Sequence, residues 1–430
     1  MRVALITPDW PAFSDGGVAT LAAVSAAGLR AAGLEVEVWT RGGGWRDVAL
    51  AAETRGRASE VELVGGSLSL DFPLRVVGLP GRAWRRRGRA HWARGLGPLV
   101  ERFDPDIMLV SPWDPLPGLW DALPRAMRSR VWVFAHGREI TADLGPERNA
   151  LREEVFRLAP GWLCLTRWLA DALAARGVAA ECIQVVPAAV AGPSASVAGP
   201  SSIEPIRPSS TSARLRCLTV GRLVKRKGHD RMLRALALRP ELDVHYDIVG
   251  EGPERLTLER LIDELELEER VTLHGHLEVV ELDRVWASAD LFVMLPRASS
   301  GGDSEGFGLV YLEAASRGIP SLGTRSGGAA EAIEHGVTGL QLPEACGAEA
   351  VAQQLAEISL DRPRLLELGG AARERWRSHH RPLEHGHVLR SLFEESEQGL
   401  LDRSAGGSPG SWVVAVRAAL PSPRPQGWQA

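Results

Sequence analysis

Several features that point to particular classes of protein are scarce in these 430 residues. The four cysteines are far apart and form no CxxC pair or cysteine–histidine cluster, which argues for reduced thiols and against a zinc site. No apolar run approaches the length of a membrane span, and the run at the start of the chain is too short for a signal peptide. A net charge of −4 gives no general attraction to nucleic acid or membranes. We therefore expect a soluble, cytoplasmic protein with no nucleic-acid partner.

Lysine is almost absent. Of the 50 basic residues only Lys225 and Lys227 are lysines, and both lie in one short loop. The sequence replaces lysine with arginine nearly everywhere else, and an ammonium on a flexible stem reaches a phosphate differently from a planar guanidinium. The retention of lysine here predicts that Lys227 is chemically required.

Apolar runs alternate with helical segments along the chain. Strands are expected at 3–7, 35–40, 106–111, 131–135, 162–166, 215–220, 244–249, 271–274 and 290–295. Apolar strands separated by helices predict an α/β protein with parallel, doubly wound sheets of the Rossmann-like kind. Ligands of such sheets bind at the carboxyl ends of the strands.

Composition also divides the chain into parts. Residues 191–213 are rich in Ser, Pro, Ala and Gly, which is typical of a linker between domains. The expected parts are a first domain, the linker, a second domain, a final helix and a loose tail, over residues 1–190, 191–213, 214–381, 382–400 and 401–430.

A glycine-rich loop joins the strand expected at 290–295 to a helix expected over 309–316. Free N–H groups at the start of such a helix, together with the helix dipole, favour an anion. Glu305 precedes this helix start and Glu313 lies within the helix. Phosphates accept from N–H groups and sugar hydroxyls donate to carboxylates, so a nucleotide sugar suits the stretch. Two glutamates alone would equally fit a surface loop before an ordinary amphipathic helix.

The full sequence of this stretch resembles the E-x7-E signature of glycosyltransferase family 4, most of all its phosphatidylinositol mannosyltransferase branch. The resemblance rests on Glu305, Gly306, Phe307, Gly308, Leu309 and Glu313, with Gly327-Gly328 expected to begin a further helix downstream. It covers about residues 1–396 and implies the GT-B fold, in which two Rossmann-like domains face each other across a cleft. It also implies that the helix at 382–400 crosses back to the first domain.

The resemblance implies a retaining hexosyltransferase that needs no metal and no cofactor. The donor is then a nucleoside diphosphate sugar, with GDP-mannose favoured and a UDP-sugar as the alternative. In this family Glu305 and the amides of residues 306–308 hold sugar hydroxyls, and Glu313 holds the ribose. The diphosphate itself is expected to take the proton of the acceptor hydroxyl.

A second stretch, from Gly221 to Gly228, resembles the family's G-R-L-x-x-x-K-G loop. Arg222 and Lys227 are then expected to neutralise the departing diphosphate, although a charged loop is more often simply solvated. The resemblance places further glycines near the donor, although the first pair would equally suit a plain tight turn. These glycines are Gly16, Gly17, Gly250 and Gly252.

His136 follows the strand expected at 131–135. A lone histidine after a strand is usually structural, but the family carries an HG-x-E here, with the histidine beside the transferred sugar. Glu139 is the weaker candidate, on the acceptor side.

Residues 82–94 contain six arginines, with Trp84 and Trp92 on one helical face. One interpretation is an interfacial helix that contacts anionic lipid on the inner face of a membrane. The favoured interpretation is a solvated helix whose tryptophans pack on the domain.

Other functions stay open at this point. A sugar phosphorylase or nucleotide-sugar epimerase would share the fold, and a non-catalytic subunit would bind a donor without turnover. The one DxD pattern, at residues 104–106, is expected to cap a strand and not to bind metal. The acceptor, whether lipid, glycan or metabolite, and the oligomeric state are not determined by the sequence.

Overall fold

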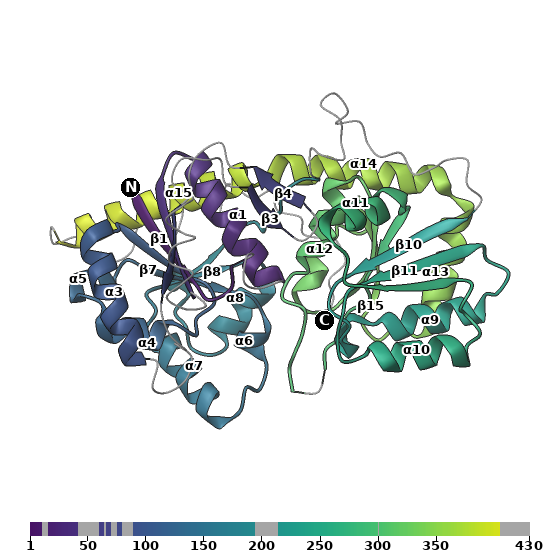
Figure 1. The fold of residues 1–430 in the computed structure, drawn as a ribbon, viewed down its shortest axis with the longest axis horizontal. Helices are drawn as coiled ribbons and strands as arrows, with labels where there is room; N and C mark the ends of the chain where they lie inside the picture. Colours follow the sequence, from purple (N-terminus) through teal and green to yellow (C-terminus); the bar gives the residue numbers. More distant parts are fainter. Residues whose placement is uncertain are drawn as a thin grey trace.

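The computed structural model describes residues 1–10, 16–41, 60–63, 66–69, 75–79, 89–193, 214–299 and 301–404. Two α/β halves lie side by side, each with its own sheet between layers of helices. Two long helices run along the same side of both halves, α14 (Arg362–His379) over the second and α15 (Pro382–Ser404) over the first (Figure 1).

Within the described residues, the first half contains a seven-stranded, wholly parallel sheet in the order β5-β2-β1-β6-β7-β8-β9. Its strands are β1 (Arg2–Thr7), β2 (Glu35–Arg41), β5 (Arg75–Leu79), β6 (Ile107–Val110), β7 (Val131–Ala135), β8 (Gly161–Cys164) and β9 (Ile183–Val185). Alternate residues of β1 face opposite layers, since Val3 and Leu5 join one buried cluster and Ala4 and Ile6 another. A separate hairpin pairs β3 (Glu60–Leu63) with β4 (Gly66–Ser69).

The second half contains a six-stranded parallel sheet in the order β12-β11-β10-β13-β14-β15. Its strands are β10 (Leu215–Val220), β11 (Val244–Val249), β12 (Val271–Gly275), β13 (Leu291–Val293), β14 (Ser321–Arg325) and β15 (Gly339–Pro343). In each sheet the winding direction reverses beside the first strand, between β1 and β6 and between β10 and β13. Such reversal points are where doubly wound sheets bind ligands.

Helices connect successive strands in both halves. In the first half they are α1 (Gly17–Ala31), α3 (Arg89–Phe103), α4 (Leu116–Ala122), α5 (Arg125–Arg128), α6 (Arg138–Thr141), α7 (Pro146–Leu158), α8 (Arg167–Ala174) and the 3-10 turn η1 (Ala180–Cys182). In the second half they are the 3-10 turn η2 (Lys225–Lys227), α9 (His229–Leu238), α10 (Arg255–Glu264), α11 (Val279–Ser288), α12 (Leu309–Ser316), the 3-10 turn η3 (Gly327–Glu331), and α13 (Ala348–Leu360).

Helix α15 packs against α1 at a glycine-to-glycine contact. A Cβ atom on Gly386 would lie 2.0 Å from the carbonyl oxygen of Gly28, so the two backbones approach more closely than any side chain would allow. One and two turns further along α15, Leu389 and Phe393 are fully buried in the core of the first half. His385 adds a polar link, because its ring nitrogens lie 2.8 Å from the Pro187 carbonyl oxygen and 2.9 Å from Ser25 Oγ. The second half is thus tied back onto the first.

The pair of parallel, doubly wound sheets confirms the fold class expected from the sequence. The helix expected to begin at Gly327-Gly328 is wrong: residues 327–331 form only the 3-10 turn η3, and Gly327 has a left-handed φ of 52°. The edge strands β5, β9 and β15 were not expected. Most of the linker, the tail from residue 405 and most of the arginine-rich segment 82–94 lie outside the described residues. No helix in the described part of the chain is both long enough and apolar enough to cross a membrane.

Candidate functional site

Loops at the carboxyl ends of both sheets meet where the two halves touch. A Cβ atom on Gly17, the first residue of α1, would lie 3.6 Å from Leu309 Cδ1 at the start of α12. The N-termini of one helix from each half therefore lie beside each other, near the middle of the molecule (Figure 1). Gly16, with φ of 124° and no atom of the described residues within 4 Å of a Cβ placed on it, precedes the first of them. Two adjacent helix N-termini favour a ligand with negative charge.

Glycine and tyrosine shape the start of α12. Gly308 adopts the left-handed φ of 82° that a side chain would strain, and a Cβ there would meet the Tyr311 ring at 2.9 Å. The Tyr311 hydroxyl donates to the Met294 carbonyl oxygen at 2.7 Å, and the Phe307 side chain is buried in the core. These contacts hold the loop before α12 against the end of β13.

Glu305, in this loop, is paired with two cations of the turn η2. Its Oε2 atom lies 2.8 Å from Lys227 Nζ and also accepts from the Arg226 guanidinium. Burial alone would raise the pKa of this carboxyl, but the charges of Lys227 and Arg226 lower the pKa to about 2. The sequence pattern predicted Glu305 and Lys227 as site residues but missed Arg226.

Arg222, which was expected to act together with Lys227, lies apart from the Glu305 cluster. The Arg222 side chain is exposed and makes no ion pair or hydrogen bond with the residues that the structure describes, so it does not join the Glu305 cluster. Gly221 lies closer: with φ of 144°, it would place a Cβ 4.0 Å from Lys227 Nζ. Arg222 is therefore available to a ligand but is not held toward one.

Close backbone packing explains why positions 250 and 252 are glycines, Gly250 and Gly252. A Cβ on Gly250 would lie 2.1 Å from the Gly221 carbonyl oxygen, and one on Gly252 would lie 2.2 Å from that of Leu223. The loop after β11 thus supports the backbone of the loop after β10, which carries Lys227. Neither glycine needs a ligand to explain it.

Glu313 is buried on α12, with 9% of its surface exposed. Burial raises the pKa of its carboxyl to about 7, and the nearby Arg317 and Lys227 charges only partly oppose that rise. No hydrogen bond joins the carboxyl to the described residues, since the contacts from Ser316 and Arg317 go to the backbone oxygen of Glu313. A buried carboxyl with no protein partner can accept hydrogen bonds from ligand hydroxyls.

His136, at the end of β7, faces the loop of the second half. Its Nε2 atom lies 2.8 Å from Ser111 Oγ, and burial lowers its pKa to about 4, so the ring is neutral at pH 7. Glu139 Oε1 accepts hydrogen bonds from the backbone N–H groups of His136 and Gly137, and burial raises the pKa of Glu139. Glu139 thereby fixes the histidine loop, a role that the sequence analysis did not give it.

The two halves touch through backbone at Gly306. A Cβ on this residue would lie 1.7 Å from the His136 carbonyl oxygen, and one on Gly328 would lie 1.8 Å from the Gly306 oxygen. Thr166 Oγ1 also donates to the Gly306 oxygen at 3.2 Å. Glu331, at the end of η3, accepts from the first N–H groups of α8. These contacts bring His136 next to the loop that carries Glu305.

The assembled site therefore has a definite chemistry. It offers an ammonium and a guanidinium beside two helix N-termini, which suit an anion, and buried carboxylates that suit hydroxyls. Within the described ranges, no group of three or more His, Cys, Asp or Glu side chains is arranged to hold a metal ion. Residues missed in the sequence, apart from Arg226, are Thr166, Asp303 and Glu331, which have partners in the other half, and Ser111, whose partner His136 lies in the same half.

Each half of the chain matches a known protein family. Residues 15–191 match the family described as Glycosyltransferase Family 4, and residues 205–375 match Glycosyl transferases group 1. A GDP-mannose-dependent alpha-(1-6)-phosphatidylinositol monomannoside mannosyltransferase of Mycobacterium tuberculosis is 39% identical over 161 residues, 37% of this chain and 41% of the relative. An N-acetyl-alpha-D-glucosaminyl L-malate synthase of Bacillus anthracis is 37% identical over 134 residues, 31% of this chain and 33% of that protein. In these matches the chain covers less than half of the relatives' own length.

Solved structures share the fold over nearly the whole chain. Anabaena HepE, solved with UDP-glucose, superposes with a TM-score of 0.66 at 17% identity over 92% of this chain and 99% of HepE. A sucrose-phosphate synthase from Thermosynechococcus elongatus gives a TM-score of 0.67 at 21% identity over 91% of this chain and 99% of the synthase. At these identities the likeness shows the fold alone, and it confirms the GT-B architecture expected from the sequence.

Proposed function

The chain belongs to the glycosyltransferases of family 4, with a group 1 transferase domain as its second half, and from that membership we propose that it moves a hexose from a nucleoside diphosphate sugar to an acceptor hydroxyl. The configuration at the anomeric carbon is retained, and mannose is the favoured hexose. The observation that carries the proposal is the position of Lys227, buried beside Glu305 where the helix N-termini of both halves meet.

In this proposal the donor diphosphate binds between the starts of α1 and α12, next to the Lys227 ammonium. Positive charge there stabilises the negative charge that grows on the diphosphate as the glycosidic bond breaks, which is usually the largest catalytic contribution. Arg222 is exposed and turns in to the diphosphate only when the donor is bound. Glu313 accepts from the ribose hydroxyls.

The sugar lies between Glu305 and His136. Glu305 stays ionised because of its two cations, so it accepts hydrogen bonds from sugar hydroxyls but is a weak nucleophile. Neutral His136 can donate or accept one hydrogen bond but carries no proton to give away as an acid at pH 7. We therefore assign no protein nucleophile: the acceptor attacks on the face from which the diphosphate leaves, and the diphosphate takes the acceptor proton.

Our expectation for the donor base and the acceptor rests on the relatives. The mycobacterial relative is named as GDP-mannose-dependent, which favours GDP-mannose, whereas HepE was solved with UDP-glucose. The acceptor is a lipid, a glycan or a small metabolite. A peripheral contact between residues 82–94 and anionic lipid stays a prediction from the sequence, checked by co-sedimentation with phosphatidylglycerol vesicles.

The test is release of nucleotide from GDP-mannose, UDP-glucose and UDP-N-acetylglucosamine, each supplied separately without acceptor. We expect slow release from one donor by the wild-type protein and by Lys225→Ala, and a loss of roughly 100-fold or more in Lys227→Ala. Lys225 is the matched control, because it lies in the same turn but is exposed. Binding of all donors without release would instead indicate a non-catalytic subunit. Release that requires inorganic phosphate would indicate a phosphorylase, and conversion of the donor sugar to its epimer would indicate an epimerase.

A further inference from the structure

The Glu305 carboxylate is shared by two cations that are neighbours in the chain. Lys227 Nζ lies 2.8 Å from Oε2, and the Arg226 guanidinium pairs with the same atom. All three side chains are largely enclosed, with 12%, 11% and 22% of the surfaces of Glu305, Lys227 and Arg226 exposed. Such enclosed pairs interact more strongly than ion pairs in open solvent.

In the proposed reaction, the Lys227 ammonium contacts more than one anionic group. Its ammonium already contacts Glu305 and the Met294 sulfur, at 2.8 Å and 3.1 Å. In the proposed reaction it also faces a diphosphate that carries several negative charges. When the ammonium turns toward the diphosphate, its hold on Glu305 weakens, and Arg226 is the cation that still contacts this carboxylate.

The backbone around Arg226 is fixed independently of its side chain. The carbonyl oxygens of Arg226 and Lys227 accept hydrogen bonds from the N–H groups of Arg297 and Leu295, at 2.9 Å and 3.2 Å. The turn η2 is therefore tied to the end of β13 by main-chain bonds. Replacing the Arg226 side chain removes the guanidinium but leaves these bonds in place.

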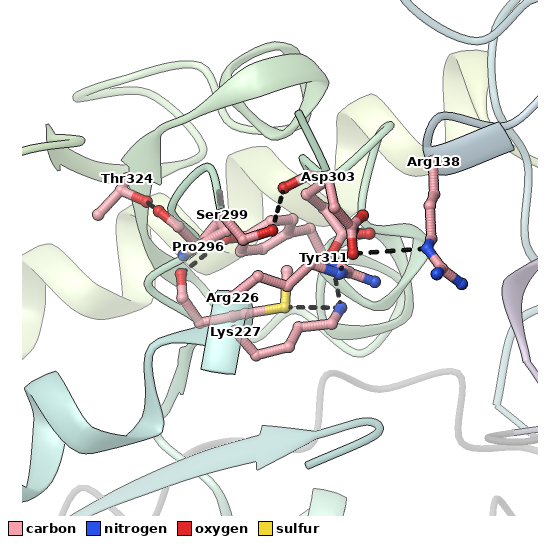
Figure 2. A network of polar contacts seen from close by, with 10 residues as sticks. Arg138, Arg226, Lys227, Pro296, Ser299, Asp303, Tyr311 and Thr324 are labelled. Carbon is pink, nitrogen blue, oxygen red and sulfur yellow. Dashed lines mark hydrogen bonds and ion pairs between the residues drawn. The ribbon is translucent and has the colours of Figure 1, made fainter. Parts of the chain in front are cut away.

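Arg226 also lies in the middle of a chain of alternating charges (Figure 2). Its Nε atom is 3.7 Å from Asp303 Oδ1, and Asp303 Oδ2 is 3.7 Å from Arg138 Nε in the first half. The pair with Arg138 is exposed and weak, and Asp303 lies between the guanidinium groups of Arg138 and Arg226. The guanidinium is thus held from two sides, which suits it to hold Glu305 in turn.

We propose that Arg226 is a positioning residue that keeps Glu305 charged and directed at the donor sugar while Lys227 engages the departing diphosphate. The inference rests on the proposed transferase function. It adds that the two neighbouring cations have different roles, Arg226 toward Glu305 and Lys227 toward the diphosphate. Lys225 has no such role, because its side chain is exposed and forms no ion pair with the residues that the structure describes.

The test compares Arg226→Gln, Arg226→Lys and the control Lys225→Gln in the nucleotide-release assay with the best donor. For Arg226→Gln we expect kcat to fall about tenfold or more while the donor KM changes less than about threefold. The acid limb of the kcat profile should move to higher pH, because Glu305 loses one of the two cations that lower its pKa. Arg226→Lys should recover most of the loss, and Lys225→Gln should match the wild type.

A double-mutant cycle separates positioning from simple stabilisation of the fold. In a Glu305→Gln background, Arg226→Gln should lower kcat by less than a further factor of about two, because Arg226 acts through Glu305. Wild-type kinetics for Arg226→Gln, an unmoved acid limb, or losses that multiply in the double variant would overturn the proposal. If the wild-type protein releases no nucleotide from any donor, the proposed function itself fails, and this inference falls with it.

Discussion

The Glu331 carboxylate of the second half accepts a hydrogen bond from the backbone N–H of Arg167 in the first half, at 2.9 Å. Its other oxygen accepts from the next N–H, that of Trp168, also at 2.9 Å. Because Arg167 begins α8, Glu331 satisfies free amides at a helix N-terminus from across the domain boundary. Thr166, which caps the same helix, donates to the Gly306 oxygen. The contact between the halves at α8 is therefore made by η3 and by the loop that precedes α12.

Removing this cross-domain cap should loosen the closed arrangement. Loss of a capping group costs about 1 kcal/mol, so we expect Glu331→Ala to lower kcat/KM for the donor by roughly fivefold. Small-angle X-ray scattering should show a larger radius of gyration for the variant. Glu334→Ala is the matched control, because Glu334 is exposed and its carboxyl makes no hydrogen bond with the described residues. Equal scattering and equal kinetics for both variants would show that Glu331 does not contribute to closure.

Glu313 should make stability fall as pH rises. Its folded pKa of about 7 lies above the value of 4.5 for the free side chain, so the folded state holds a proton that the unfolded state releases. The resulting penalty is absent below about pH 4.5, grows between there and about pH 7, and reaches at most about 3 kcal/mol. We expect Glu313→Gln to unfold at a higher temperature than the wild type at pH 8 and at the same temperature at pH 4. The same variant should bind donor more weakly. A Tm difference that is equal at both pH values would contradict this account of Glu313.

The contact of α15 with α1 depends on the absence of a side chain. Gly386→Ala places a methyl group 2.0 Å from the Gly28 oxygen, and we expect it to destabilise the fold by about 2 kcal/mol. Gly370→Ala is the control: it lies exposed in α14 with nothing within 4 Å of its new Cβ. Alanine there should stabilise the helix by up to about 1 kcal/mol. Thermal unfolding measures both, and a Tm for Gly386→Ala at or above that of the wild type would contradict the packing described here.

Metal removal should leave turnover unchanged. In the proposed reaction the Lys227 ammonium and the helix N-termini supply the charge that a divalent ion would otherwise supply to the diphosphate. We expect the same rate of nucleotide release in the presence of EDTA as in its absence. A rate that EDTA abolishes and magnesium restores would show that the diphosphate needs a metal ion.

Local patterns were enough to predict much of this molecule. The buried strands and the helix at 309–316 follow from apolar runs and glycine stops, so their positions were expected within a residue or two. Of the four edge strands, β12 was expected, whereas β5, β9 and β15 were missed because polar residues or glycine interrupt their short apolar runs. Glu305 and Lys227 stood out because of their spacing and of the rarity of lysine.

The contacts that cross between distant segments could not be predicted. Arg226 was one arginine among many, and only the folded turn shows that it faces Glu305. Glu331 and Thr166 act across the domain boundary, and no local pattern reports a partner more than a hundred residues away. Gly250 was expected near a nucleotide from its motif, and the motif gave no sign that its missing side chain also admits the backbone of Gly221.

The central claim is that a nucleoside diphosphate binds at Lys227. The most direct measurement is calorimetric titration of GDP and UDP into the wild-type protein, Lys227→Ala and Lys225→Ala. We expect one nucleotide to bind the wild type and Lys225→Ala with equal Kd and to bind Lys227→Ala at least about tenfold more weakly. The same Kd for both variants, or no binding of either nucleotide to the wild type, would contradict it.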